Sequence, residues 1–591
     1  MSAKHFINDP TKLVDSALNS VTLTNPNVAL DPDHKIVYRR PNDSHPPQVS
    51  IISGGGSGHE PSFASMVGPG MLSAAVAGTI FASPSAEQVR RAITSRVQTA
   101  EGILVVVMNY TGDVLNFGMA VEKARASGTR VEMVVVGDDV GVGRTKAGKV
   151  GRRGIAGTVL VLKIAGALAA QGRSLEEVSQ VAKLTADNLV SVGASLEHVH
   201  VPGRDLTQED KLELGEVEIG MGIHNEAGSG RGKMDLPELV KKMLSQLLDA
   251  SDADRAFLNV NSNECVLLVN NLGGVSPLEL GGITAEVVSQ LRENWSIQPV
   301  RILAGTFMTS LNGLGFSISL LNVVNTNIGG PSMIELLDAD SEVTGWSAPI
   351  KKTTWEAKNK AVLTENAEDS AQQAKPSGLK IDPQVATKAL TTALQTVIAA
   401  EADITRYDTV VGDGDCGIGL KRGAEAILSH IDKQPLREDI VSSLASIVNV
   451  VENVMDGTSG ALYAIFLNAL VKGLHEQGPG DATPEVWAKA LKHSCDALSK
   501  YTPARPGDRT LIDALYPYVE TLGQTGDVKK AADASRKGAE GTKGMKASLG
   551  RTVYVGGSLY EEVPDPGAWG LACFFTGLAG QKPNEEGWES I

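Results

Sequence analysis

The chain has 591 residues, 42% hydrophobic and 21% charged, an ordinary balance for folded proteins that excludes wholesale disorder. This length exceeds what one compact core can organise and predicts several domains or lobes. The formal net charge of −15 argues against nucleic acid as a partner, because an acidic surface gains nothing from releasing DNA counterions. An acidic chain that binds an anion must do so locally, with backbone N–H groups, a metal or a few cations.

The cysteines and the apolar runs exclude further classes. Cys265, Cys416, Cys495 and Cys573 are far apart and form no CxxC pair, so neither a disulfide framework nor a structural zinc site is predicted. No uninterrupted apolar stretch reaches the roughly 18 residues of a membrane span, and the N-terminus lacks the apolar segment of a signal peptide. These features predict a cytoplasmic protein with no membrane partner.

The first half of the chain alternates short apolar runs with longer helical patterns. Strand candidates lie at 49–52, 103–108 and 131–136, with helical patterns at 85–99 and 120–127. This alternation predicts an α/β domain with a parallel sheet. A second α/β lobe is predicted from near residue 240, with strands at 256–260, 266–270 and 300–304 and a helix at 285–292.

The composition changes in the second half. The hydrophobic pattern thins from about residue 338 to 380, and the run 367–378 is polar and rich in alanine and serine. Residues 350–380 are therefore predicted to be an interdomain linker or, alternatively, a surface helix of the first domain. After residue 381, strand candidates nearly vanish and amphipathic helical windows dominate. We therefore predict an α/β domain over 1–349, a linker over 350–380 and an all-α domain over 381–591.

Two polar loops follow strand candidates of the first half. Residues 53–61 (SGGGSGHEP) contain glycines that let the backbone approach a ligand and form a nest of N–H groups. Residues 109–113 (NYTGD) place Asp113 where it could act as a general base. The carboxyl ends of parallel strands are the expected position for ligands. The alternatives are a plain glycine turn and a helix N-cap at Asp113.

Histidines and basic residues provide further candidates. The segment 220–226 (GMGIHNE) places a histidine between glycine and polar residues rather than on an apolar face. A zinc site formed by His198, His200, Asp205 and Glu209 is possible in principle, but the spacing fits no motif with a known mechanism. The basic residues in the glycine-rich stretch 144–153 either contact a phosphate or form a solvated loop.

The segment 408–417 (DTVVGDGDCG) is the most specific signal in the chain. Its three carboxylates, Asp408, Asp413 and Asp415, can converge on a hard cation, because Mg²⁺ combines carboxylates with substrate phosphates. The segment lacks the final glutamate of an EF-hand, and the alternative is an acidic turn between helices. Four further glycine-containing turns predict a nucleotide-diphosphate pocket, and they lie at 456–461, 506–510, 550–552 and 565–567.

Taken together, these motifs make the chain similar to the single-chain, ATP-dependent dihydroxyacetone kinases of eukaryotes, also called glycerone or triose kinases. The motifs SGGGSGHEP, NYTGD, VGDDVGVGR, RRGIAGT and GMGIHNE match the substrate-binding K domain of that family. The motifs D-x4-GDGDCG, GTSGALY, PGDRT, GR-x-x-Y and DPG match its nucleotide-binding L domain. The resemblance covers nearly the whole chain. It implies a two-lobed α/β K domain followed by an all-α helical-barrel L domain.

The resemblance also implies an activity and residue roles. The chain would phosphorylate dihydroxyacetone, and D-glyceraldehyde, with ATP. His224 would bind the carbonyl carbon of dihydroxyacetone as a hemiaminal, which rejects glycerol. Asp113 would act as base, helped by His59. The substrate would be surrounded by Gly56, Ser57, Gly58 and His59, with position 108 nearby.

On the nucleotide side, the resemblance implies two Mg²⁺ ions held by Asp408, Asp413 and Asp415, which would chelate the phosphates of ATP. This arrangement would let an acidic protein handle ATP without a Walker lysine. The residues implied to line the nucleotide site are Cys416, Gly417, Ile418, Gly419, Thr458, Ser459, Thr502, Leu511, Arg551, Asp565, Pro566 and Gly567.

Two positions depart from the family pattern. Met108 stands where many relatives have a lysine, and Ala227 replaces the proline of the usual HNEPG. Two other functions stay open, namely cyclisation of FAD to cyclic FMN with Mn²⁺ and ligand binding by a regulator. If the linker is too short for the half-sites to meet in one chain, a head-to-tail homodimer would bring the L domain of one chain to the K domain of the other.

Overall fold

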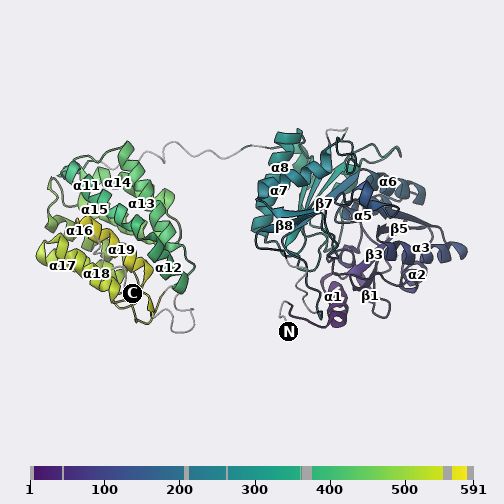
Figure 1. Cartoon of the computed structure of the whole chain (residues 1–591), viewed down its shortest axis with the longest axis horizontal. Coiled ribbons are helices and arrows are strands. Elements are labelled where there is room, and N and C mark those ends of the chain that lie inside the picture. Colours follow the sequence, from purple (N-terminus) through teal and green to yellow (C-terminus); the bar gives the residue numbers. More distant parts are fainter. Residues whose placement is uncertain are drawn as a thin grey trace. The chain divides into compact units, whose positions relative to one another are not determined.

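The computed structural model describes residues 5–42, 46–204, 212–260, 264–359, 361, 376–549 and 562–581. The chain divides into two compact units, Met1–Ala361 and Val362–Ile591, and each is described by itself (Figure 1). The N-terminal unit is α/β and the C-terminal unit is helical, which confirms the predicted fold class. Within the described ranges, no helix is long and apolar enough to cross a membrane.

The first sheet of the N-terminal unit has the strand order β1-β2-β4-β3-β5-β6. Its strands are β1 (Val28–Asp31), β2 (Ile36–Arg39), β3 (Ser50–Ser57), β4 (Ala74–Ile80), β5 (Ile103–Met108) and β6 (Val131–Val136). The predicted strands correspond to β3, β5 and β6, which run parallel together with β4. The sequence analysis missed β4 as well as β1 and β2, which extend the sheet in antiparallel fashion. Strand β4 is rich in alanine and glycine. Strands β1 and β2 are short and lack a long apolar run.

The second sheet has the order β11-β10-β12-β7-β8-β9. Its strands are β7 (Leu189–Ser195), β8 (Glu216–Ile219), β9 (Gly230–Lys233), β10 (Cys265–Asn271), β11 (Arg301–Gly305) and β12 (Gly315–Asn322). Only β10 and β11 are parallel, so this sheet is mostly antiparallel rather than parallel.

The second sheet departs from the sequence analysis in two further ways. It begins with β7, so the predicted split near residue 240 does not coincide with the boundary between the sheets. The small and polar residues of β7 hid this strand from a search for apolar runs. Residues 256–260 form a loop rather than the predicted strand, and the carbonyls of Ala253 and Ala256 accept hydrogen bonds from the guanidinium of Arg144 instead of from a strand.

Helices separate and cover the two sheets. They are α1 (Pro10–Thr24), α2 (Ala86–Ser95), α3 (Thr111–Ala126), α4 (Arg144–Ala147), α5 (Thr158–Ala170), α6 (Leu175–Asp187), α7 (Leu236–Leu248), α8 (Pro277–Trp295), α9 (Met333–Asp338) and α10 (Lys352–Ala357). Figure 1 shows α7 and α8 on the outer side of the second sheet, α5 between the sheets, and α2 and α3 beyond the first sheet.

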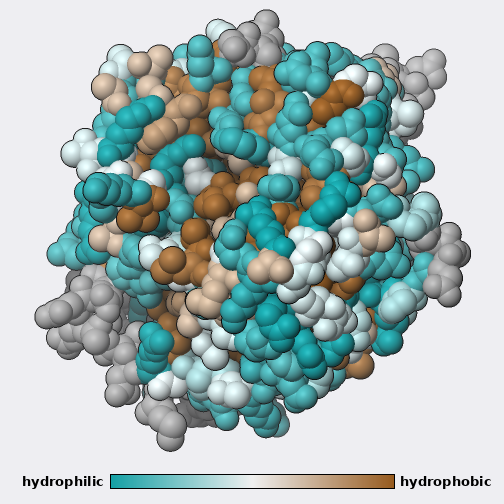
Figure 2. All heavy atoms as spheres, turned by 90° about the vertical axis from the view of Figure 1, so that its right-hand side faces the viewer, coloured by the Kyte–Doolittle hydropathy of each residue, from teal (hydrophilic) through white to brown (hydrophobic). Residues whose placement is uncertain are grey.

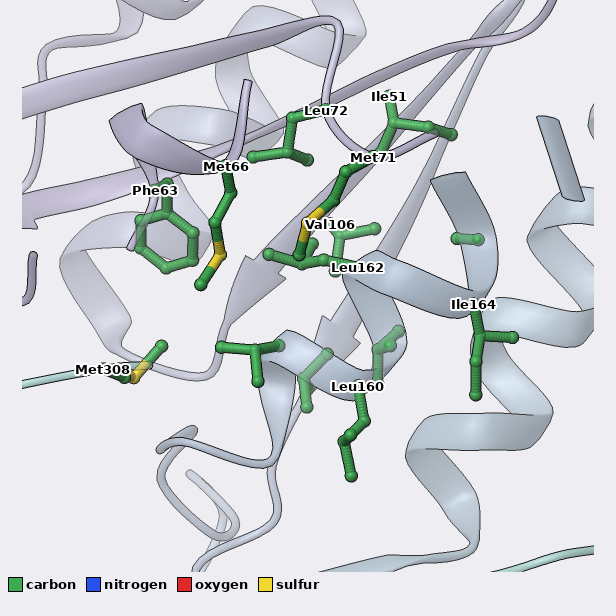
Figure 3. Close-up of a cluster of buried hydrophobic side chains, with 14 of the residues drawn as sticks. Ile51, Phe63, Met66, Met71, Leu72, Val106, Leu160, Leu162, Ile164 and Met308 are labelled. Carbon is green, nitrogen blue, oxygen red and sulfur yellow. The ribbon is translucent and has the colours of Figure 1, made fainter. Parts of the chain in front are cut away.

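The alternation of side chains along each strand explains this layering. On β5, Leu104 and Val106 join the central core around α5, whereas Val105 and Val107 pack towards α2 and α3. Residues 158–169 of α5 are all buried, as expected for a helix that is apolar on every side. Figure 3 shows Leu160 of α5 in this central core, together with Met308 from a loop that follows the second sheet's β11.

The outer face of the N-terminal unit is mostly hydrophilic. Figure 2 shows hydrophobic residues gathered in places among hydrophilic ones on the face that lies to the right in Figure 1. Exposed apolar side chains of this unit include Leu115 and Met119 of α3 and Val135 of β6. Single exposed apolar residues of this kind are ordinary on folded proteins.

The C-terminal unit consists of helices and one short two-stranded sheet. The helices are α11 (Pro383–Ala399), α12 (Glu401–Val411), α13 (Cys416–Lys433), α14 (Ile440–Val454), α15 (Gly457–His475), α16 (Pro484–Leu498), α17 (Ile512–Thr525), α18 (Val528–Glu540) and α19 (Pro566–Leu578). The strands are β13 (Leu379–Lys380) and β14 (Gly480–Asp481). The helices surround a cavity of about 1450 Å³ whose lining includes Leu420, Phe466, Trp487 and Phe574.

The start of the predicted linker packs against the N-terminal unit. Helix α10 lies within the predicted linker, and Lys352 forms an ion pair with Glu335 of α9. The guanidinium of Arg301 lies 5.5 Å from the centre of the Trp355 ring. The alternative reading, a surface helix of the first domain, therefore holds for α10. Residues 360 and 362–375 lie outside the described residues.

Candidate active site

His59 lies just beyond the end of β3 and is completely buried. Its Nδ1 is 2.8 Å from the carbonyl oxygen of Thr309, and a carbonyl can only accept, so Nδ1 carries the hydrogen. Burial first, and then the charge of His224, lower the pKa of His59 to about 3. His59 is therefore a neutral imidazole whose Nε2 has a free lone pair.

His224 lies in the loop after β8 and faces His59. The two Nε2 atoms are 3.0 Å apart, and Nδ1 of His224 is 3.0 Å from Oε1 of Glu226. Two lone pairs would repel at this distance, so a hydrogen lies between the Nε2 atoms. Because His59 is neutral, that hydrogen belongs to His224. Burial would raise the pKa of Glu226, but hydrogen bonds and charge from His224 lower it to about 2.

Aromatic rings enclose the histidine pair. The Phe81 and Tyr110 rings lie 5.1 and 4.7 Å from the His224 ring, centre to centre, and Phe81 also stacks on His59. Burial raises the pKa of Tyr110 well above its usual value, so its hydroxyl stays neutral. That buried hydroxyl has no hydrogen-bond partner among the described residues. The sequence analysis gave neither aromatic residue a role, because nothing in the motifs shows that the rings converge.

Asp113 lies beside the glycine-rich loop, in the first turn of α3. Its side chain is 5% exposed, and a Cβ at position 55 would lie 3.8 Å from its Oδ1. Burial raises the pKa of Asp113, while a hydrogen bond from Ser83 opposes the shift. Oδ1 accepts no hydrogen bond within the described part of the chain. The N-cap of α3 is Tyr110, so the alternative reading of Asp113 as a helix cap is wrong.

The loop at 53–61 needs glycine at positions 56 and 58, because residues 81 and 82 approach its backbone closely. A Cβ at position 56 would lie 2.7 Å from the Ala82 nitrogen, and Gly58 has a φ of +106° with the Phe81 ring beside it. The hydroxyl of Ser57 donates to the carbonyl of Gly78 at 2.8 Å. Any contact of Ser57 with a substrate would therefore compete with this bond.

The structure explains how the two departures from the family pattern are accommodated. Met108 is 1% exposed and packs in the central core, so its side chain cannot take the place of a polar lysine in the site. Its carbonyl accepts the N–H of Tyr110 at 2.8 Å. The carbonyl of Ala227 accepts a hydrogen bond from Lys146 at 3.1 Å, which holds this turn without a proline.

The arginines of the segment 144–153 make intramolecular contacts. The guanidinium groups of Arg144 and Arg152 lie 4.1 and 4.3 Å from the centre of the Phe257 ring. Arg153 forms an ion pair with Asp139. These contacts favour neither a dedicated phosphate site nor a merely solvated loop. The segment joins the first sheet to the loops of the second.

The zinc alternative is not supported. His198 is paired with Glu218 at 3.0 Å, and Asp205 and Glu209 lie outside the described residues. Across the described ranges, one group of three potential metal ligands occurs, and it lies in the C-terminal unit.

That group consists of the three predicted carboxylates. Asp408 is buried at the end of α12 and accepts the N–H of Cys416 at 2.9 Å, while Asp413 and Asp415 are exposed in the loop before α13. One oxygen of each carboxylate lies within 4.8 Å of the others. Gly414, with a φ of +79°, allows the tight turn that brings them together. Hard oxygen ligands, two of them open to solvent, suit Mg²⁺.

Helix N-termini surround this cluster. The Sγ of Cys416 in α13 and the Oγ of Ser459 in α15 are 4.0 Å apart. Asp565 caps α19 by accepting the N–H of Ala568 at 2.8 Å, and burial raises the pKa of Asp565 to about 6. A Cβ at position 567 would lie 3.6 Å from the Cβ of Leu511, which places the start of α17 nearby. Among the described residues, the N-cap side chains of α13 and α15 accept no hydrogen bond from their helices, so these two helix starts can offer backbone N–H groups to a ligand.

The other predicted nucleotide residues differ in accessibility. Ile418 and Thr458 are exposed, and a Cβ at Gly419 would meet no atom within 4 Å. Gly417 and Pro566 are buried and act in packing. Thr502 accepts the N–H of Ala504 in its own loop. Arg551 lies outside the described residues.

Comparisons with known proteins agree with this architecture. A model of the Dak1 domain matches residues 19–345, and a model of the DAK2 domain matches residues 410–580. A dihydroxyacetone kinase of Pichia angusta is 43% identical over 606 residues, covering 98% of each protein. A triokinase/FMN cyclase of Homo sapiens is 35% identical and covers 98% of this chain and 99% of its own length.

A solved structure matches over the same extent. The dihydroxyacetone kinase from C. freundii in complex with AMP-PNP and Mg²⁺ aligns with a TM-score of 0.63 and 32% identity, covering 98% of this chain and 100% of that one. The chain therefore belongs to the dihydroxyacetone kinase family, as the resemblance of its motifs predicted.

Proposed function

We propose that this chain transfers the γ-phosphoryl group of ATP to a terminal hydroxyl of dihydroxyacetone. The observation that supports this best is the His59–His224 pair, whose Nε2 atoms are 3.0 Å apart. The carboxylate of Asp113 is close enough for the charge of His224 to oppose the rise of its pKa. This arrangement offers a nucleophile and a base to one small carbonyl compound. The family supports the reaction, since relatives at 43% identity are named dihydroxyacetone kinases.

The proposed capture step forms a hemiaminal on His224. The proton between the two Nε2 atoms moves to His59, and Nε2 of His224 bonds to the carbonyl carbon of dihydroxyacetone. The π electrons of the carbonyl move to its oxygen, which then takes the proton from His59 and becomes a hydroxyl. The His224 ring ends as a cation with its Nδ1 hydrogen facing Glu226. Glycerol has no carbonyl and cannot be held in this way.

Asp113 is the proposed general base for phosphoryl transfer. Its carboxylate would take the proton of the terminal hydroxyl as that oxygen attacks the γ-phosphorus, and ADP would leave. A buried carboxylate with a raised pKa is a stronger base than an exposed one. D-Glyceraldehyde, whose aldehyde can be captured in the same way, is the proposed second substrate.

The carboxylate cluster of the C-terminal unit is the proposed Mg²⁺ site. The oxygens of Asp408, Asp413 and Asp415 lie close enough to share a cation, so these residues fit the metal. When bound, Mg²⁺ would neutralise negative charge on the phosphates of ATP. Backbone N–H groups at the starts of α13 and α15, neither of which has a side-chain cap among the described residues, would hold phosphate oxygens. We propose two ions, a number that metal titration in the presence of ATP would measure.

A coupled assay for dihydroxyacetone phosphate tests the proposal. The full chain, given Mg²⁺, ATP and dihydroxyacetone, is expected to form product, and omission of Mg²⁺ should abolish turnover. A folded chain that binds dihydroxyacetone and ATP without forming product would instead be a ligand-binding regulator, and the proposal would fail.

FMN cyclase activity is a second candidate, because mammalian relatives at 35–36% identity are named triokinase/FMN cyclase. This reaction would use the nucleotide site of the C-terminal unit with FAD and Mn²⁺. Release of cyclic FMN from FAD, measured beside kinase turnover, separates the two activities. His224→Ala should impair only the kinase reaction.

Phosphoryl transfer also requires that the two sites meet. We propose a head-to-tail homodimer, in which the nucleotide site of one chain serves the substrate site of the other. Light scattering with a parallel activity measurement tests this arrangement. A fully active monomer would contradict it.

A further inference from the structure

We infer that Glu226 is a positioning residue that fixes the tautomer of His224 and balances the charge of the covalent adduct. The inference rests on the proposed function, because it concerns the same capture step. It starts from a residue whose only sequence signal is its place two positions after His224.

Both oxygens of the Glu226 carboxylate accept hydrogen bonds from His224 itself. Oε1 is 3.0 Å from Nδ1 of the imidazole, and Oε2 is 3.0 Å from the backbone nitrogen of the same residue. A carboxylate offers two acceptors and no donor when it is ionised. Glu226 therefore holds one hydrogen of His224 on Nδ1. Nε2 is then the atom that can attack a carbonyl, once its own hydrogen has passed to His59.

The loop is shaped to place this carboxylate. A Cβ at position 222 would overlap Oε2 of Glu226, so only glycine leaves room for it. The N–H of Gly222 also donates to the carbonyl of Glu226 at 2.8 Å, which closes the loop. Asn225 anchors the loop from the other side, with two 2.9 Å hydrogen bonds to the backbone of Val199.

The guanidinium of Arg153 lies beside the carboxylate of Glu226. Arg153 Nη1 lies 3.9 Å from Oε2 of Glu226, while the same guanidinium pairs with Asp139 and donates to the carbonyl of Gly220 at 2.7 Å. The end of β8, which precedes the loop of His224, therefore holds Arg153 in place. Its positive charge favours the ionised form of Glu226.

In the capture step, the Glu226 carboxylate compensates the positive charge that the His224 ring carries in the adduct. Once Nε2 is bonded to carbon, the ring carries a positive charge with hydrogen on Nδ1, and Oε1 of Glu226 faces that hydrogen directly. A charge-assisted hydrogen bond to Nδ1 then compensates the positive charge of the adduct. Without the Glu226 carboxylate, the positively charged His224 ring of the adduct would face the aromatic rings of Phe81 and Tyr110 with no anion beside it.

Glu226→Gln is the sharpest test, because glutamine keeps the shape but has only one acceptor oxygen. If its oxygen takes the backbone N–H of His224, its NH₂ group faces Nδ1 and forces the hydrogen to Nε2. If its oxygen takes Nδ1, the NH₂ group opposes the backbone N–H. Inverting the tautomer of a catalytic histidine costs about 10⁴-fold in rate in a serine protease. We expect hemiaminal formation to fall by at least about 100-fold.

The experiment measures the adduct directly on the full chain. Dihydroxyacetone labelled with ¹³C at the carbonyl is titrated, and NMR follows the change of that carbon from trigonal to tetrahedral. The wild type and Glu238→Gln, a surface control whose carboxylate pairs with Lys242, should form the adduct. Glu226→Gln should not, and Glu226→Asp should recover only part of it. Adduct formation by Glu226→Gln at the wild-type level overturns the inference.

A second measurement does not depend on the folding of any variant. ¹⁵N-histidine NMR of the wild-type adduct should show a hydrogen bonded to Nδ1 of His224. An Nδ1 without hydrogen overturns the role of Glu226 but leaves covalent capture intact. A wild-type chain that forms no adduct at all contradicts the capture step itself, and the inference falls with it.

Discussion

Replacement of Asp113 by asparagine removes the proposed base while keeping the volume and polarity of the side chain. The residue is 5% exposed in the first turn of α3, and its Oδ1 has no hydrogen-bond partner within the described residues. Asparagine should therefore fit without strain. It cannot accept a proton from the substrate hydroxyl.

The size of the effect follows from the burial of the site. A positioned general base contributes about 10²–10⁴ in rate, which equals about 3–5 kcal/mol of barrier at 1.36 kcal/mol per tenfold. Bulk water reaches Asp113 poorly and cannot replace it, so we expect kcat of Asp113→Asn to fall by about 10³-fold or more. The hemiaminal should still form, because capture uses the two histidines.

The assay is the coupled measurement of dihydroxyacetone phosphate as a function of pH. Burial raises the pKa of Asp113, so the wild-type rate should decline on the acidic side at a higher pH than an exposed aspartate would cause. That limb should vanish in Asp113→Asn. Asp33→Asn, at an exposed position, is the matched control. A variant at position 113 with kcat within tenfold of the wild type would refute the role of the base.

Three further predictions concern the substrate, the metal and the core. His224→Ala should lower kcat/KM for dihydroxyacetone and lose discrimination against glycerol, and unchanged selectivity in competition assays would speak against capture. Asp413→Asn should abolish Mg²⁺-dependent ATP binding in titration calorimetry, whereas retained binding would show that the metal lies elsewhere. Leu160→Ala, in the fully buried α5, should destabilise the N-terminal unit by about 2–5 kcal/mol in denaturant unfolding, and a loss below 1 kcal/mol would contradict the packing described.

The strands that could be predicted from the sequence are those made of a continuous run of large apolar residues. Strand β5 is predicted with its bounds, because a parallel strand buried on both faces gives a continuous apolar run. Strand β6 is also predicted with its bounds, because its residues are mostly valine, although Glu132 and Val135 are exposed. Strand β7, with the sequence LVSVGAS, is fully buried, but its small and polar residues give no such run. Residues 256–260 show the reverse case, because they include apolar residues but form a loop rather than a strand. Periodicity alone cannot separate these two cases.

The site also contains residues that the sequence could indicate and contacts that only the structure shows. The sequence analysis singled out His59 and Asp113 because they follow strand candidates, and His224 because it lies between glycine and polar residues. It could not show that Tyr110 and Phe81 enclose the pair, since those contacts join distant loops. For Met108, the sequence pattern suggested a position near the substrate that its side chain does not occupy. A motif position suggested a place in the site, and the structure buries the side chain in the core.

The most direct test of the account is the formation of dihydroxyacetone phosphate by the full chain, measured beside His224→Ala and Asp413→Asn. The account predicts Mg²⁺- and ATP-dependent product for the wild type, a reduced kcat/KM for the first variant and no product for the second. A folded wild-type chain that forms no product, or an Asp413→Asn variant that turns over normally, would contradict it.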